Sequence, residues 1–458
     1  MSDHLFDGFD PVSSKQWKQQ IQFELKGADY NETLVWESPE GIKVKPFYHI
    51  DEAVTPLTSG GKLDTFSICQ NIFVHDVAKS AGRAASTLKR GAESLRFTIN
   101  DENIDIKALL ANVPVTTPVY FHLSFLSVEF IRALDAIAKE REAASFVQID
   151  PIGHLAKEGN WFSDREKDFE ALNTLAIACQ NIHFLGVDGS LYQNAGATIV
   201  QQLAYILAHA NEYFNEVATI HKPIVVQLSV GTNYFFEIAK LRALRLLFET
   251  VAKEYGHSPD CHILAMPTKR NKTLYDYNVN MLRTTTECMS TILGGADSVA
   301  NLAYDALYHK DNEFGDRIAR NQLLVLKHES YFDKVSNPSD GAYYIEELTR
   351  QLAEKALALF KDIEANGGFI TQLKEGTIQR KIQESAAKEQ ELFDSGKEVL
   401  LGTNKYPNKN DRMAHDLELY PFVKVSPRKT AIIPIIEKRL AEKLEQERLE
   451  SEKSESIS

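Results

Sequence analysis

The feature that most constrains the fold is a regular alternation of short apolar runs with helix-length segments between about residues 66 and 400. The short runs are rich in β-branched and aromatic residues, which is typical of buried strands. The segments between them, such as 197–214, 235–255 and 279–293, carry apolar residues at i, i+3 and i+4, which predicts amphipathic helices. The predicted strands cover residues 95–99, 119–123, 146–149, 182–187, 224–228, 262–266, 298–302 and 332–335.

Eight strand–helix units in a row favour an α/β fold of the (β/α)8 TIM-barrel type. The alternative is an open doubly wound sheet, but no Gly-x-Gly-x-x-Gly turn follows the first predicted strand, which disfavours it. We therefore expect an N-terminal arm over residues 1–60 with a helix near 14–26, the barrel over 61–410, and a C-terminal segment over 411–458.

The charge and the cysteines exclude several classes of protein. The net charge of −13 over 458 residues argues against a nucleic-acid groove and against docking on anionic membranes. No apolar run approaches the roughly 18 residues that a membrane helix needs, and the acidic N-terminus does not resemble a secretory signal. The four cysteines form no Cys-x-x-Cys pair and no zinc spacing, which predicts free thiols in a cytoplasmic protein and no metal site.

The C-terminal end differs in composition from the rest of the chain. Residues 437–458 are mostly Glu, Lys, Arg and Ser, with a helical apolar stripe at Ile436, Leu440 and Leu444. This composition predicts a solvated, charged helix that frays into a disordered tail. The alternative is a short helix that binds a partner.

One short segment carries a family resemblance. Residues 189–197 read Gly-Ser-Leu-Tyr-Gln-Asn-Ala-Gly-Ala, which resembles the active-site segment Gly-Tyr-His-Met-Gln-Glu-Ala-Gly-Ala of the methylmalonyl-CoA mutase family. The resemblance implies a barrel that threads an acyl-CoA along its axis, with adenosylcobalamin on a separate domain that closes the carboxyl-terminal face. Further blocks with the same likeness lie at 34–36, 40–42, 293–298, 337–344 and 401–404.

The same resemblance shows where this chain departs from catalytic members. The family's catalytic histidine falls on Leu191 and the tyrosine before it on Ser190. Two further polar positions read Leu264 and Met266, and a final histidine position reads Ala300. Because a leucine can neither donate a hydrogen bond nor carry a proton, we expect no catalytic residue and no cofactor-binding residue in this chain.

Other expected features of a catalytic member are also missing from the sequence. The cobalamin signature Asp-x-His-x-x-Gly has only an imperfect match at 260–265, so we expect His262 to be satisfied within the protein. No arginine lies between 151 and 164 to hold the substrate carboxylate, and Asp150 and Glu158 are expected to cap and solvate a loop. Burying an unpaired polar group costs about 1–3 kcal/mol, so the apolar replacements suit an axis filled by Leu191, Leu264 and Met266.

The resemblance therefore implies the small, non-catalytic subunit of a heterodimeric methylmalonyl-CoA mutase, with adenosylcobalamin bound by a large catalytic partner. Two alternatives remain open: an active barrel completed in trans by a separate cobalamin-binding chain, and an assembly factor. In the family, related arms wrap the neighbouring subunit, and large aromatic side chains dominate interface energetics. We expect the arm to contact the partner through Phe6, Phe9, Trp17, Phe23 and Trp36, unless these rings pack on the chain's own barrel.

Overall fold

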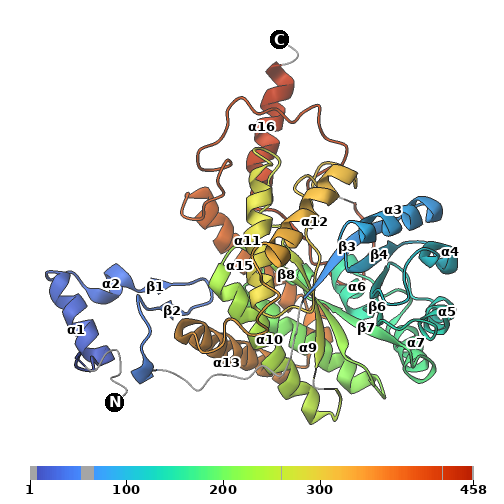
Figure 1. Ribbon diagram of the computed structural model, residues 1–458, viewed down its shortest axis with the longest axis horizontal. Helices are drawn as coiled ribbons and strands as arrows, with labels where there is room; N and C mark the ends of the chain where they lie inside the picture. The colour runs from blue at the N-terminus through green and yellow to red at the C-terminus, as the bar shows by residue number, and fades with distance from the viewer. Residues whose placement is uncertain (1–7, 53–65, 259, 425, 456–458) are drawn as a thin grey trace.

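The computed structural model describes residues 8–52, 66–258, 260–424 and 426–455. Its centre is a closed parallel barrel, with the strand order β10-β3-β4-β5-β6-β7-β8-β9 (Figure 1). The barrel closes where Ser298 of β10 pairs with Ser67 of β3, which confirms the predicted (β/α)8 fold. The strands are β3 (Ser67–Val74), β4 (Ser94–Ile99), β5 (Val119–Leu123), β6 (Ser145–Ile149), β7 (Ile182–Asp188), β8 (Ile224–Val230), β9 (Cys261–Pro267) and β10 (Ser298–Val299).

The predicted strand at 332–335 is wrong. These residues form a turn, in which Phe332 N donates to Leu326 O at 3.1 Å and Lys334 N donates to Tyr331 O at 3.2 Å. The eighth barrel strand is instead β3, which the sequence pattern did not predict. Gln70 and Asn71 interrupt its apolar pattern, yet Gln70 is buried and bonded to Arg320 Nη1 at 2.9 Å.

The strands alternate between two faces, as a period of two requires. In β6, Phe146 and Gln148 point into the barrel, whereas Val147 and Ile149 join the main core between the strands and the helices.

The surrounding helices are α3 (Val77–Lys89), α4 (Ile106–Leu110), α5 (Val128–Ala138), α6 (Pro151–Glu158), α7 (Arg165–Ala178), α8 (Ser190–Asn194), α9 (Ile199–Glu216), α10 (Tyr234–Glu254), α11 (Val279–Leu293) and α12 (Glu313–His328).

Local sequence sets where these helices begin. Asp76, Asp164 and Thr198 each accept a hydrogen bond from the backbone N–H three residues on, which satisfies an otherwise unpaired donor. After the barrel, α13 (Tyr343–Ala365) packs against α9 and α10, and it is followed by α14 (Phe369–Lys374) and α15 (Thr377–Asp394).

The N-terminal arm projects sideways from the barrel (blue in Figure 1). It contains α1 (Ser14–Glu24), α2 (Tyr30–Leu34), the antiparallel pair β1 (Trp36–Glu37) and β2 (Lys43–Val44), and the 3-10 turn η1 (Ile50–Glu52). The predicted helix near 14–26 is confirmed, and Ser13 caps it in a capping box with Gln16.

The prediction of a solvated C-terminal helix is wrong. The helix α16 (Glu442–Glu455) buries Leu449, and its Glu445 accepts a hydrogen bond from Leu274 N at 2.8 Å. Its Glu452 accepts from Tyr275 Oη at 2.7 Å. The carboxylates of Glu445 and Glu452 thus face the body of the protein, because the backbone N–H of Leu274 and the hydroxyl of Tyr275 donate hydrogen bonds to them. The predicted fraying at 456–458 lies outside the described residues.

None of the helices in the described part of the chain is long and apolar enough to cross a membrane. The domain boundaries near residues 60 and 410 stay predictions.

Candidate functional site

The amino-terminal end of the barrel axis is filled by stacked rings, which we call the aromatic layer: Tyr120, Phe146, His183 and His262. The Phe146 ring centroid lies 4.5 Å from that of Tyr120, 4.6 Å from His183 and 4.3 Å from His262. The Tyr120 hydroxyl contacts both His262 Nε2 and Ser298 Oγ at 2.7 Å, so His262 is satisfied within the protein, as predicted. Burial lowers the pKa of His183 to about 4 and also lowers the pKa of His262, which keeps both rings neutral at pH 7.

The middle of the axis is filled by a buried guanidinium and three side-chain amides, the Arg96 layer. Arg96 Nε donates to Gln148 Oε1 at 3.0 Å, Nη2 to Gln227 Oε1 at 2.8 Å, and Nη1 reaches Asn71 Oδ1 at 3.5 Å. Burial lowers the pKa of Arg96, but a guanidinium stays protonated in proteins. The cation therefore sits on the axis itself, held by amide oxygens from β3, β6 and β8.

The positions that the resemblance identifies as altered are apolar and packed. Leu264 is fully buried, and it forms one interior cluster with Ala300 and Val225, against which Met266 packs. Leu264 and Met266 thus fill the axis, as predicted. Leu191 is only 2% exposed, but it belongs to the main hydrophobic core and not to this interior cluster. The prediction that Leu191 fills the barrel axis is therefore wrong.

At the carboxyl-terminal mouth, the polar groups are bonded to one another. The Ser190 hydroxyl donates to Asp188 Oδ1, and Gln227 Nε2 donates to Asp188 Oδ1 at 3.0 Å and to Ser190 Oγ at 2.9 Å. Burial raises the pKa of Asp188, while the positive charge of Lys157 opposes the rise. Ser190 has no histidine partner among the described residues, so it lacks the base that a serine nucleophile needs.

His122, on β5 near the mouth, was not among the predicted site residues. Burial and then the charge of Arg96 hold the pKa of His122 well below 6.5. A general base works best with a pKa near the operating pH, so this neutral imidazole is poorly matched to proton abstraction. In the sequence, His122 appears only as a histidine within the predicted strand at 119–123. No spacing to other residues identifies it as a candidate site residue.

The carboxylate of Asp150 belongs to the framework behind the mouth. It caps α6 through Gly153 N at 2.8 Å, and it accepts from His209 Nε2 at 2.7 Å and from Tyr213 Oη at 2.6 Å. Burial alone would raise the pKa of Asp150, but these hydrogen bonds and the His209 contact lower it. The prediction of a cap is confirmed, whereas the predicted solvation is wrong because the side chain is 11% exposed.

Within the described residues, no group of three or more His, Cys, Asp or Glu side chains is placed to hold a metal ion. The four cysteines are buried and free. Burial raises the pKa of the Cys69 thiol to about 12 and that of Cys179 to about 11, so neither is a thiolate at pH 7.

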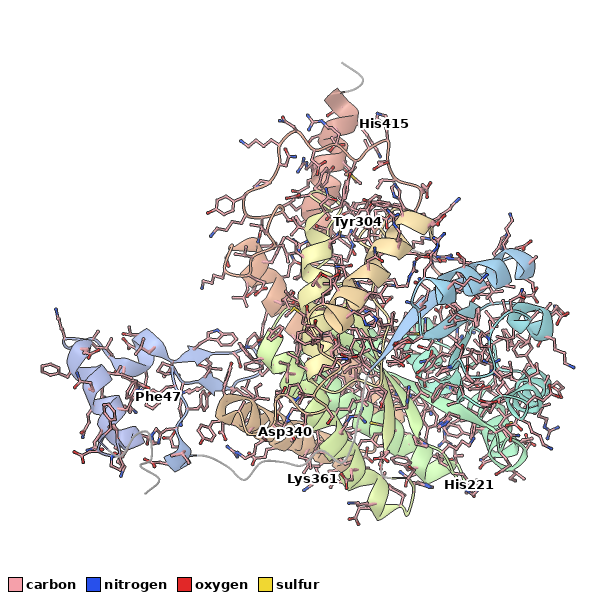
Figure 2. All side chains as sticks on the ribbon, in the orientation of Figure 1. Phe47, His221, Tyr304, Asp340, Lys361 and His415 are labelled. Carbon is pink, nitrogen blue, oxygen red and sulfur yellow. The ribbon has the colours of Figure 1, made fainter. Side chains whose placement is uncertain are left out.

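The arm carries the exposed aromatic surface, which we call the arm rings: Phe9, Trp17, Phe23 and Trp36. Their exposed fractions are 77%, 53%, 79% and 48%. Trp17 meets the ring of Phe47, which Figure 2 places on the arm, at a centroid distance of 6.0 Å. Trp36 alone of the four has a ring contact with the barrel among the described residues, with Phe236 at 5.7 Å. Phe6 lies outside the described residues, and the arm as an interface stays a prediction.

The sequence of this chain is similar to known proteins of one family. The family model for methylmalonyl-CoA mutase matches residues 97–453. The chain belongs to the methylmalonyl-CoA mutase family. A relative named methylmalonyl-CoA mutase small subunit, from Porphyromonas gingivalis, is 31% identical over 89% of this chain and 71% of its own length.

Two further members of the methylmalonyl-CoA mutase family show how far the likeness extends. A small subunit from Streptomyces virginiae is 26% identical over 88% of this chain and 72% of its own length. A methylmalonyl-CoA mutase from Rhizobium meliloti is 27% identical over 88% of this chain and 65% of its own length. This chain therefore aligns along most of its own length but with only part of each relative.

Proposed function

We propose that this chain is the small, non-catalytic subunit of a heterodimeric, adenosylcobalamin-dependent methylmalonyl-CoA mutase. In this proposal the large subunit interconverts succinyl-CoA and (R)-methylmalonyl-CoA, and this chain stabilises it. The observation that carries the proposal is the barrel axis, which the chain's own side chains fill through the aromatic layer and the Arg96 layer. The printed names of the Porphyromonas and Streptomyces relatives support the small-subunit role.

A filled axis is incompatible with threading an acyl-CoA. The pantetheine arm would have to displace Phe146 from three ring contacts and Arg96 from the amide oxygens that solvate its charge. Each amide oxygen left buried without a donor costs about 1–3 kcal/mol. The loss of a general acid–base residue, with Leu191 at the family's histidine position, would cost a further factor of about 10² to 10⁴ in rate.

The lining of the barrel mouth favours a cobalamin bound by the partner over one bound by this chain. Ser190, Asp188 and Gln227 already satisfy one another, and Leu264 and Met266 offer no donor. We therefore assign adenosylcobalamin to the partner and derive no chemical step in this chain.

The arm supplies the proposed contact with the large subunit. Its base is fixed to the barrel, since the Glu40 carboxylate accepts from Ile199 N and Val200 N, each at 2.8 Å, at the start of α9. Beyond this anchor the arm projects away from the barrel (Figure 1), and most of the arm rings are exposed. Rings of this size that face solvent are typical of hot spots at protein interfaces.

The test is reconstitution with the large subunit from the same organism. We expect the two chains to co-elute in gel filtration as a heterodimer with adenosylcobalamin-dependent mutase activity, and this chain alone to show neither turnover nor a retained cobalamin spectrum. Turnover when this chain is combined with a separate small cobalamin-binding protein would favour the trans-completed enzyme instead. Failure to co-elute with the large subunit would contradict the proposal.

A further inference from the structure

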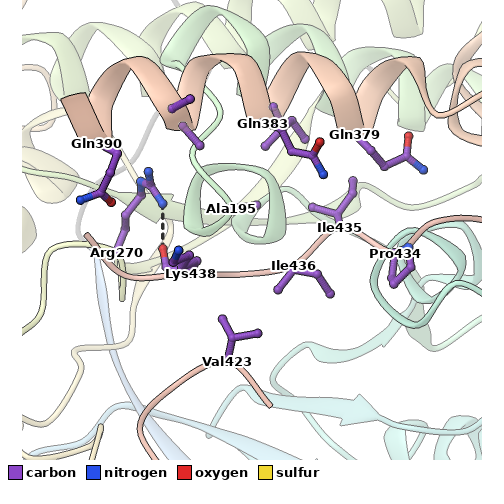
Figure 3. Close-up of a pocket in the computed structure, with 13 residues that line it drawn as sticks. Ala195, Arg270, Gln379, Gln383, Gln390, Val423, Pro434, Ile435, Ile436 and Lys438 are labelled. Carbon is purple, nitrogen blue, oxygen red and sulfur yellow. Dashed lines mark hydrogen bonds between the residues drawn. The ribbon is translucent and has the colours of Figure 1, made fainter. Parts of the chain in front are cut away.

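We infer that a pocket beside the barrel mouth binds an aliphatic carboxylate, a small molecule with an unbranched apolar body and one carboxylate group. The pocket has a volume of about 410 Å³ (Figure 3). It lies between α15, the loop after α8, the loop after β9, and the extended segment 434–438. This inference concerns a site outside the barrel axis and does not rest on the proposed subunit role.

The pocket is preformed, because the extended segment that makes one wall is fixed along its length. Ile435 N donates to Ala156 O at 2.7 Å, and Lys438 N donates to Asn194 O at 3.1 Å. Gln379 Nε2 of α15 donates to Ile433 O at 2.8 Å, which ties the segment to the opposite wall. A rigid site loses little conformational entropy when a ligand enters.

The floor of the pocket is apolar. Ile382 and Ile435 are 2% and 4% exposed, and small side chains on α15 leave space above them. At the end wall, Gly196 has a φ of +102°, and a Cβ there would come within 2.5 Å of Ala386 Cβ, so the loop reaches the helix only because it carries a glycine. A cavity of about 150 Å³ holds one benzene, so the 410 Å³ here has room for an apolar body of about eight carbons.

One end of the pocket is cationic. Arg270 is 6% exposed; its Nε donates to Glu389 at 2.5 Å and its Nη1 donates to Lys438 O at 2.7 Å (Figure 3). Its Nη2 makes no hydrogen bond with the described residues. Lys438 lines the pocket and is exposed, and its ammonium makes no ion pair with the described residues. The Glu389 carboxylate neutralises the charge of Arg270. The positive charge of Lys438 is therefore the one that can pair with an anionic ligand. A carboxylate between Lys438 Nζ and Arg270 Nη2 would make charge-assisted hydrogen bonds.

The experiment is calorimetric titration of the full chain with octanoate, octanol and octylamine, which share one apolar body. We expect saturable binding of octanoate at least tenfold tighter than that of the other two. We expect Lys438→Met to lower octanoate affinity to about that of octanol, while Lys443→Met, on the exposed side of α16, leaves it within twofold.

A matched pair of variants tests the apolar body. Ile436 lines the pocket and is 51% exposed, whereas Ile433 lies in the same extended run, is 64% exposed and does not line it. We expect Ile436→Glu to weaken octanoate binding at least tenfold and Ile433→Glu to leave it within twofold. No saturable octanoate binding, equal affinity for octanol, or equal loss in the two glutamate variants would overturn the inference. If Ile436→Glu lowers the melting temperature, the Lys438→Met comparison decides.

Discussion

Replacing Phe146 with alanine would remove the central ring of the aromatic layer. The ring is 4% exposed and lies within 4.6 Å, centroid to centroid, of three other rings. A buried Phe→Ala change costs about 3–5 kcal/mol, and each lost ring pair adds about 0.5–1.5 kcal/mol before the cavity relaxes. We therefore expect the free energy of unfolding to fall by at least about 4 kcal/mol.

Urea denaturation followed by circular dichroism and by tryptophan fluorescence measures this loss. With an m value of about 3 kcal/mol/M or more for a domain of this size, the midpoint falls by about 1 M. Phe23→Ala is the matched control, because that ring is 79% exposed and its loss is expected to cost under about 0.5 kcal/mol. A loss below about 1 kcal/mol for Phe146→Ala, similar to the control, would show that the axis is loosely packed and would refute the reasoning.

Three further predictions concern pH, activity and the arm. Burial depresses the pKa of His183 from 6.5 to about 4, so its contribution to stability is full above pH 6.5 and is lost as the pH falls towards 4; His183→Phe is expected to flatten that part of a pH series of thermal melts. Leu191→His is expected to give no mutase turnover with adenosylcobalamin, because groups that act as a unit are not restored singly and the axis stays filled; measurable turnover would contradict this. The double variant Trp17→Ser, Phe23→Ser is expected to weaken binding to the large subunit at least 100-fold in surface plasmon resonance at an unchanged melting temperature, whereas Ile177→Ser, 78% exposed on α7, leaves the affinity unchanged.

The architecture could be predicted because the periodicity of most elements agrees with their burial. The predicted run at 119–123 matches β5, and the predicted helix at 279–293 matches α11 residue for residue. The two errors in the barrel have one cause. The run at 332–335, Phe-Asp-Lys-Val, resembles a strand only in its local sequence. By contrast, β3 contains Gln70 and Asn71, whose hydrogen-bond partners come from distant parts of the chain.

The contents of the axis could be predicted only in part. Apolar replacements such as Leu264 can be recognised in the sequence, because a leucine side chain cannot donate a hydrogen bond wherever it lies in the fold. The Arg96 layer is different, because the sequence alone does not show which side chains surround an arginine within a strand. Its hydrogen-bond partners Gln148 and Gln227 lie 52 and 131 residues away along the chain. Composition also misled at α16, where Glu445 is buried because Leu274 N and Arg439 are there to meet it.

The number of acyl-CoA sites in the heterodimer tests the central claim most directly. Equilibrium dialysis with labelled succinyl-CoA, without adenosylcobalamin, would count those sites on the isolated chain and on the complex with the large subunit. A barrel filled by its own side chains predicts no saturable site on this chain and one site per heterodimer. Saturable binding to the isolated chain, or two sites per heterodimer, would contradict it.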